Sequence, residues 1–133
     1  MKTTYLFQYG KGNIGGTLIR QILRHGGALA AQHDIKLEYI GFCGQEQVVL
    51  SQEGLNSALT GGDAINKVLE EHPDSRAYDS ADELLEEAIR LSRSNLCVID
   101  STSGELTDIH LDCLRQSIPV ITANKKPASD EYT

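Results

Sequence analysis

The chain has 133 residues, of which 40% are hydrophobic and only 5% aromatic, and its formal net charge at pH 7 is −7. This length is enough for one domain with a single core that needs no disulfide or structural metal. The acidic balance excludes a general nucleic-acid binder, and no stretch approaches the ~20 apolar residues of a membrane span or the core of a signal peptide. A cytoplasmic protein that binds neither nucleic acid nor a membrane is expected.

The three cysteines form no CxxC pair, and their odd number argues against a disulfide framework. They are Cys43, Cys97 and Cys113. Reduced, packed thiols in a reducing compartment are predicted.

The first third of the chain predicts a strand, a glycine turn, a helix and a second strand. The apolar and aromatic run Tyr5–Tyr9 is typical of a buried strand and ends at Gly10. Apolar residues then recur at three- and four-residue spacing, which predicts an amphipathic helix from about Asn13 until Gly26-Gly27 weaken it. Leu37–Cys43 is expected to form the second strand.

The middle of the chain predicts a short strand and two helices. Gln47–Ser51 has the pattern of a short strand of uncertain pairing. Asp63 can cap a helix that Pro73 ends. Ser80 and Glu83 have the spacing of a capping box, in which each side chain satisfies amides of the first helical turn.

The last third predicts a strand, a helix and a strand. The run at 96–99 (LCVI) is typical of a strand in the middle of a parallel sheet, a helix follows over Leu106–Cys113, and Ile118–Thr122 is expected to form a final strand. Strands and helices that alternate at these lengths favour parallel pairing through right-handed crossovers. The fold class is therefore α/β, with a Rossmann-like, doubly wound, mostly parallel sheet and helices on both faces, and residues 1–133 are expected to form this one domain.

A glycine motif, GKGNIGG, lies between the first strand and the first helix. Its Gly10, Gly12 and Gly15 satisfy GxGxxG, in which the first glycine permits the turn, the second lets the backbone approach a pyrophosphate, and the third lets helix and strand pack closely. Free amides at the helix start attract the same anion. The position predicts dinucleotide binding; the alternative is that the glycines only form a tight turn.

The choice between NAD and NADP stays open from the residues. An acidic side chain after the second strand would bind the ribose 2′-hydroxyl and a basic one a 2′-phosphate. The segment at 42–46 (FCGQE) is neither cleanly acidic nor basic, and Glu46 is either a late ribose ligand or an ordinary solvated side chain.

Two further segments follow predicted strands. In 100–104 (DSTSG), Thr102 and Ser103 can contact ribose or nicotinamide, or they can cap the next helix. In 122–126 (TANKK), Lys125 can lie near the reactive ring of the cofactor, or the two lysines can simply be solvated.

The three motifs, in this order, resemble the amino-terminal domain of homoserine dehydrogenases, above all the dehydrogenase portion of the forms fused to aspartokinase. GKGNIGG at 10–16 is similar to that family's GxGNxGG turn, VIDSTS at 98–103 to its VDCTS segment, and VITANKK at 120–126 to its VxTxNKK segment. Tyr132 also has a counterpart in the family. The similarity covers nearly the whole chain and is weakest over 45–78.

The resemblance implies reversible hydride transfer between NAD(P)H and aspartate semialdehyde, giving homoserine. Thr102 and Ser103 would contact the ribose and nicotinamide side, and Lys125 would lie beside nicotinamide and substrate. The residues that would hold the pyrophosphate are Gly10, Gly12, Asn13, Ile14 and Gly15. At 43–45 the chain lacks the basic residue that relatives carry near this point, so the resemblance does not decide between NAD and NADP.

In that family a second domain follows, with the sheet that pairs subunits, acidic residues that bind the amino acid, and a lysine that donates a proton. This chain has no counterpart of that domain. It is expected to bind a nicotinamide dinucleotide without turning over by itself and to need no metal. A small amino-acid substrate is expected only with the missing domain, and a homo-oligomer is a further expected partner. The alternative is a stand-alone module that binds or senses the dinucleotide without catalysis.

Overall fold

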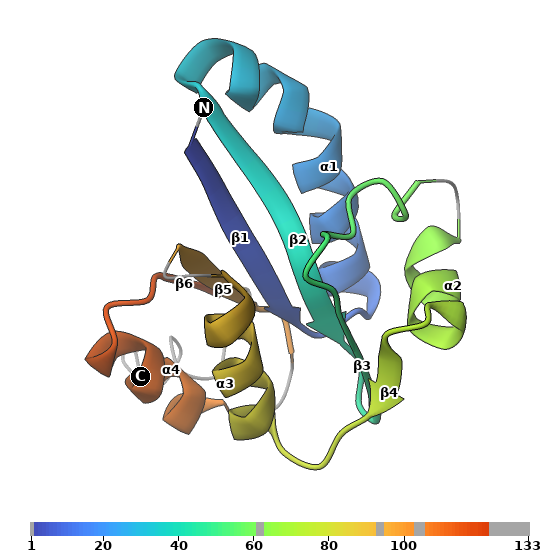
Figure 1. Ribbon diagram of the computed structural model, residues 1–133, viewed down its shortest axis with the longest axis vertical. Helices are drawn as coiled ribbons and strands as arrows, with labels where there is room; N and C mark the ends of the chain where they lie inside the picture. Colours follow the sequence, from blue (N-terminus) through green and yellow to red (C-terminus); the bar gives the residue numbers. More distant parts are fainter. Residues whose placement is uncertain (1, 61–62, 93–94, 103–105, 123–133) are drawn as a thin grey trace.

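The computed structural model describes residues 2–60, 63–92, 95–102 and 106–122, and its described part forms one six-stranded sheet with four helices (Figure 1). The strands are β1 (Lys2–Tyr9), β2 (Ile35–Cys43), β3 (Gln47–Leu50), β4 (Ser75–Ala77), β5 (Leu96–Asp100) and β6 (Val120–Thr122). The helices are α1 (Asn13–His33), α2 (Ala64–Glu71), α3 (Ala81–Ser92) and α4 (Thr107–Arg115).

The sheet has the strand order β4-β3-β2-β1-β5-β6, in which β1, β2, β5 and β6 run parallel. The chain leaves β1 through α1 to pair β2 on one side, and β5 later pairs β1 on the other side. This reversal makes the carboxyl ends of β1 and β5 a topological switch point, where open α/β sheets bind their ligands. The predicted α/β class with a mostly parallel sheet is confirmed.

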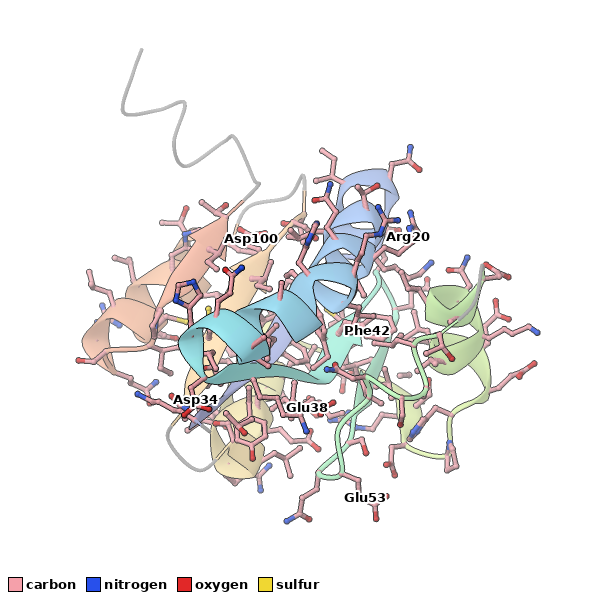
Figure 2. The ribbon with its side chains drawn as sticks, turned by 90° about the horizontal axis from the view of Figure 1, so that it is seen from above. Arg20, Asp34, Glu38, Phe42, Glu53 and Asp100 are labelled. Atoms are coloured by element: carbon pink, nitrogen blue, oxygen red, sulfur yellow. The ribbon has the colours of Figure 1, made fainter. Side chains whose placement is uncertain are left out.

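Helices cover both faces of the sheet because neighbouring strand residues point to opposite sides. Leu6 packs with Ile19 of α1 and the apolar face of α2, whereas the next residue, Phe7, packs with Leu84 of α3 and Ile109 of α4. Figure 1 shows α1 on one side of the long strands and α3 with α4 on the other. In Figure 2, α1 crosses over the sheet above Phe42. Phe42 is fully buried and belongs to the core on the α1 side of the sheet, together with Leu6 and Ile19.

The edge formed by β3 and β4 is antiparallel, which the sequence left open for β3. β3 pairs antiparallel with β2 after a short turn, and β4, which the sequence did not predict, pairs antiparallel with β3. The three residues of β4, SRA, contain no bulky apolar side chain, so hydrophobic periodicity cannot reveal them. The edge strand forms because β3 offers it a row of backbone donors and acceptors.

α1 continues through Gly26-Gly27 to His33, so the expected weakening there was wrong. Each glycine costs the helix up to about 1 kcal/mol relative to alanine, but the segment that follows is rich in alanine, the strongest helix former. The helix ends where Asp34 adopts the left-handed conformation, with φ 55°, and its amide donates to Ala30 O (3.2 Å).

The helix caps predicted at Ser80 and Asp63 are found in part. Ser80 Oγ accepts a hydrogen bond from the Glu83 amide (3.2 Å), which is one half of the predicted capping box. The Glu83 carboxylate pairs with Arg76 at 3.2 Å instead of turning back to its own helix start. Asp63 is the N-cap of α2, as expected, but its side chain makes no capping hydrogen bond.

The last strand is shorter than predicted, since β6 begins at Val120 and not at Ile118. Pro119 has no N–H for the ladder, and only its carbonyl takes part, accepting from the Val98 amide (2.9 Å). The three cysteines are buried and unpaired, as predicted. In the part of the chain that the structure describes, no helix is long and apolar enough to cross a membrane.

Candidate functional site

A cavity of about 1040 Å³ opens at the carboxyl ends of the central strands, at the switch point of the sheet. Its volume matches the upper range of small-molecule pockets, roughly 300–1,000 Å³. The glycine turn (10–15) and the β2–β3 connection (43–47) form two of its walls, and parts of α2, the β4–α3 segment and residues 101–102 complete it. The cavity is therefore lined by segments that are far apart in the sequence.

Most of the sequence-predicted site residues line this one cavity. They are Gly10, Gly12, Asn13, Ile14, Gly15 and Thr102. Ser103 and Lys125 lie outside the described residues, as do Lys126 and Tyr132. Glu46 also lines the cavity, with an exposed side chain.

Two glycines of the turn are required by the protein itself. Gly10 has φ 103°, which favours glycine, and a Cβ there would lie 2.7 Å from Ser101 Oγ. A Cβ on Gly15 would lie 2.8 Å from Gly10 O and 2.6 Å from Ser101 Oγ, closer than a Cβ atom approaches other heavy atoms. Gly10 therefore shapes the turn, and Gly15 allows α1 to pack against the end of β1.

Gly12 has no such internal reason to be glycine. Its φ is −66° with an extended ψ, and a Cβ there would meet no protein atom within 4 Å. Since Gly12 lines the cavity, the space beside it is open to whatever enters the cavity. Gly10 thus shapes the turn, Gly15 allows close packing, and Gly12 leaves open space. These three roles match the GxGxxG pattern, in which the second glycine lets the backbone approach a pyrophosphate.

The start of α1 adds a positive end to the cavity. Gly12 is the N-cap, no side chain caps the helix, and its first turn contains no acidic residue. By the geometry of an α-helix, the amides of Asn13, Ile14 and Gly15 have no partner within the helix. Together with the dipole of a 21-residue helix, they favour an anion at this point.

A buried polar network under the turn fixes its shape. Gln8 is fully buried in β1, and its Nε2 donates hydrogen bonds to Gly10 O (3.0 Å) and Gly15 O (2.9 Å). Its Oε1 accepts from the Tyr39 hydroxyl (2.9 Å), so both ends of the amide are satisfied. From the next strand end, Ser101 Oγ reaches Tyr9 O at 2.9 Å.

Sequence reasoning missed Gln8 and did not assign Ser101, although both hold the glycine turn. The available signal was a single polar residue inside the apolar strand at 5–9, since a buried amide needs partners. For Ser101 the spacing gave no signal, because its partners lie more than 90 residues earlier in the chain.

Asp100 anchors the segment that carries Thr102. Figure 2 shows Asp100 at the end of β5, where it is fully buried. Its Oδ1 accepts from the Thr102 amide (3.0 Å) and hydroxyl (2.8 Å), and its Oδ2 lies 2.8 Å from His110 Nε2. Thr102 does not cap the next helix, because α4 has Leu106 as its N-cap. Its side chain instead belongs to the cavity wall.

Two titratable side chains in the wall beside β2, Cys43 and Tyr78, have raised pKa values. Burial raises the pKa of the Cys43 thiol, and burial followed by the neighbouring Cys43 raises the pKa of Tyr78 to about 12. The Tyr78 hydroxyl donates to Gly44 O (2.7 Å), which ties the β4–α3 segment to the end of β2. This part of the cavity combines an aromatic side chain with a fixed strand end.

Solved homoserine dehydrogenases share this fold at low sequence identity. A hyperthermophilic archaeal homoserine dehydrogenase mutant in complex with NADPH is 19% identical, with a TM-score of 0.71 over 98% of this chain and 38% of that one. The enzyme from Thermoplasma acidophilum is 18% identical, with a TM-score of 0.62 over 93% and 36%. The S. aureus enzyme is 14% identical, with a TM-score of 0.60 over 95% and 27%.

The chain thus spans between 27% and 38% of the length of these structures. No curated protein sequence matches it. The family model of the homoserine dehydrogenase NAD-binding domain matches residues 10–133, which include the glycine turn, the segment after β5 and the final lysines. The chain therefore belongs to the family of homoserine dehydrogenase NAD-binding domains.

Proposed function

We propose that the glycine turn binds the pyrophosphate of NAD(H) or NADP(H), and that the chain acts as the cofactor domain of a homoserine dehydrogenase. The observation that carries this proposal is Gly12, which lines the cavity with open space where a Cβ would be. The uncapped start of α1, with no acidic residue in its first turn, supports it. The NADPH in the archaeal structures supports the same class of ligand.

The proposed roles of the described site residues are supported by their places in the cavity wall. Thr102 would contact the ribose and nicotinamide side from a segment that Asp100 holds. Gln8 and Ser101 would keep the turn in its binding shape without touching the ligand. Ser103 and Lys125 are proposed, from the family resemblance, for the nicotinamide side. The residues proposed for the pyrophosphate are Gly10, Gly12, Asn13, Ile14 and Gly15.

The proposed reaction is reversible hydride transfer between the nicotinamide and aspartate semialdehyde, giving homoserine. The nicotinamide would supply or take up the hydride. This chain's part is to hold the dinucleotide at the switch point, with Lys125 near the substrate oxygen. A second domain would bind the amino acid and pair the subunits into a homo-oligomer. We place this enzyme in amino-acid biosynthesis in the cytoplasm, where its three buried thiols stay reduced.

Titration calorimetry of the chain with NADH and with NADPH tests the proposed binding. At least one of the two is expected to bind, weakly, because only part of the nicotinamide pocket is supplied by this domain. If neither binds at millimolar concentration, the glycine turn is a structural feature only and the proposal fails.

A further inference from the structure

Lys11 lies between the first two glycines of the turn, but its side chain reaches away from them toward the end of β2. A Cβ placed on Gly44 would lie 3.1 Å from Lys11 Cε and 3.6 Å from its Cδ. Its Nζ donates a hydrogen bond to Asn66 Oδ1 of α2 (3.0 Å). The aliphatic part of Lys11 therefore crosses the first residue after β2, and its ammonium lies between that residue and α2.

Asn66 is itself held in the orientation that Lys11 needs. Its Nδ2 donates to Asp63 Oδ1 (3.1 Å), so its oxygen is the end of the amide that faces Lys11. The ammonium is thus positioned by a neutral acceptor. Among the residues that the structure describes, no carboxylate forms an ion pair with Lys11.

The Lys11 ammonium lies near the position at which doubly wound folds recognise the adenine ribose. The adenine ribose is recognised just after the second strand, where a basic side chain binds a 2′-phosphate. That segment carries no basic side chain here, since β2 ends at Cys43 and Gly44-Gln45 follow. Of the cavity-lining residues in the described ranges, Lys11 alone is a lysine or arginine.

We propose that Lys11 binds the 2′-phosphate of NADP(H), so that this chain prefers NADP(H) over NAD(H); the inference rests on the proposed function. A phosphate monoester carries about two negative charges and strong acceptor oxygens, and an ammonium binds it with charge-assisted hydrogen bonds. Gly44 contributes to this site, because a side chain at position 44 would come into close contact with the Lys11 side chain. Glu46 and Glu70 line the same cavity with exposed side chains, and neither forms an ion pair with Lys11.

The proposal predicts a selective effect of Lys11→Ala. The wild-type chain should bind NADPH more tightly than NADH in titration calorimetry. Lys11→Ala should lower the affinity for NADPH by about tenfold to a hundredfold, the scale of a lost hydrogen bond to a charged group. The affinity for NADH should change less than about threefold, since that ligand lacks the 2′-phosphate.

Two further variants keep the test decisive. Lys67→Ala, on the same helix as Asn66 but exposed and outside the cavity, should leave both affinities unchanged. Lys11→Arg keeps the cation and should keep the preference for NADPH. Thermal unfolding of each variant verifies that it is folded.

The outcomes separate this inference from the proposed function. If NADH binds at least as tightly as NADPH, or if Lys11→Ala weakens both ligands equally, Lys11 does not recognise the 2′-phosphate and the inference is overturned. An equal loss would place Lys11 on the pyrophosphate instead. If the wild-type chain binds neither nucleotide, the proposed function has failed, and the inference with it.

Discussion

A side chain at Gly12 would meet only what enters the cavity, because no protein atom lies within 4 Å of its Cβ position. Gly12→Val is therefore expected to abolish binding of NADH and NADPH, since the branched side chain takes the space of the pyrophosphate. The fold should survive with a loss of about 1 kcal/mol, or a few degrees in Tm. Titration calorimetry and thermal unfolding measure the two effects; unchanged affinity would refute the role of Gly12.

Gly15→Ala is the matched control for that variant. Its Cβ would lie 2.8 Å from the backbone oxygen of Gly10, so the turn or α1 must shift. A stability loss of about 1–3 kcal/mol is expected from this overpacking. Substitution at Gly12 should thus affect mainly nucleotide binding, and substitution at Gly15 should affect mainly stability. A Gly15→Ala protein as stable as wild type would contradict the packing role of Gly15.

At single residues, the sequence predicts what local spacing encodes and misses what the fold brings together. The GxGxxG spacing predicted Gly10, Gly12 and Gly15 because the three glycines lie in one short segment of the sequence. The contact of Gln8 with Ser101 joins residues 93 positions apart, so no local pattern predicts it. Buried hydrogen bonds of this kind are determined only once β1 and β5 lie side by side.

α1 is the element in which the structure and the sequence pattern differ most clearly. Gly26 and Gly27 lie inside the helix, and a Cβ on either would meet no atom within 4 Å. The double substitution Gly26→Ala and Gly27→Ala should raise the free energy of unfolding by about 0.5–1 kcal/mol per site, because alanine loses less backbone entropy.

Thermal unfolding measures the effect of this pair, with an expected rise of several degrees in Tm. The cofactor cavity is at the other end of α1, so nucleotide affinity should stay unchanged. A helix that stopped at the glycine pair would place these residues in a loop, and the substitutions would then give no gain or a loss.

The other elements show where periodicity succeeds and where it cannot. The amphipathic helices α2, α3 and α4 were predicted because their buried positions recur at helical spacing. β4 was missed because three residues without a bulky apolar side chain carry no such signal. The antiparallel direction of β3 depends on a short turn and on an exposed sheet edge, which local sequence does not specify.

At the scale of the molecule, alternating strands and helices were enough to predict a mostly parallel sheet with helices on both faces, whereas the strand order that creates the switch point comes from the structure. Two large apolar side chains in the last part of the described chain are exposed, Ile121 of β6 at 53% and Leu114 of α4 at 75%. The chain spans little more than a third of the archaeal enzymes that share its fold. The proposed reaction is therefore tested in a longer protein that also contains the proposed substrate domain.

In such a longer protein, Lys125 is expected to stabilise the charge that develops on the substrate oxygen. Removing a preorganised donor from a shielded site costs roughly 2–4 kcal/mol, so Lys125→Ala should lower kcat/KM for homoserine by about thirtyfold to a thousandfold. Lys126→Ala is the matched control, and a solvated lysine should cost under about 1 kcal/mol, or less than tenfold.

The measurement is kcat/KM for homoserine in wild type, Lys125→Ala and Lys126→Ala at matched cofactor saturation, because a variant that only weakens cofactor binding recovers when the cofactor saturates. If both variants keep near-wild-type rates, or if Lys126 is the sensitive position, the role given to Lys125 is wrong. If the wild-type protein binds the dinucleotide but does not act on homoserine, the proposed reaction fails while the binding site stands, because pyrophosphate binding depends on the glycine turn and not on the substrate domain.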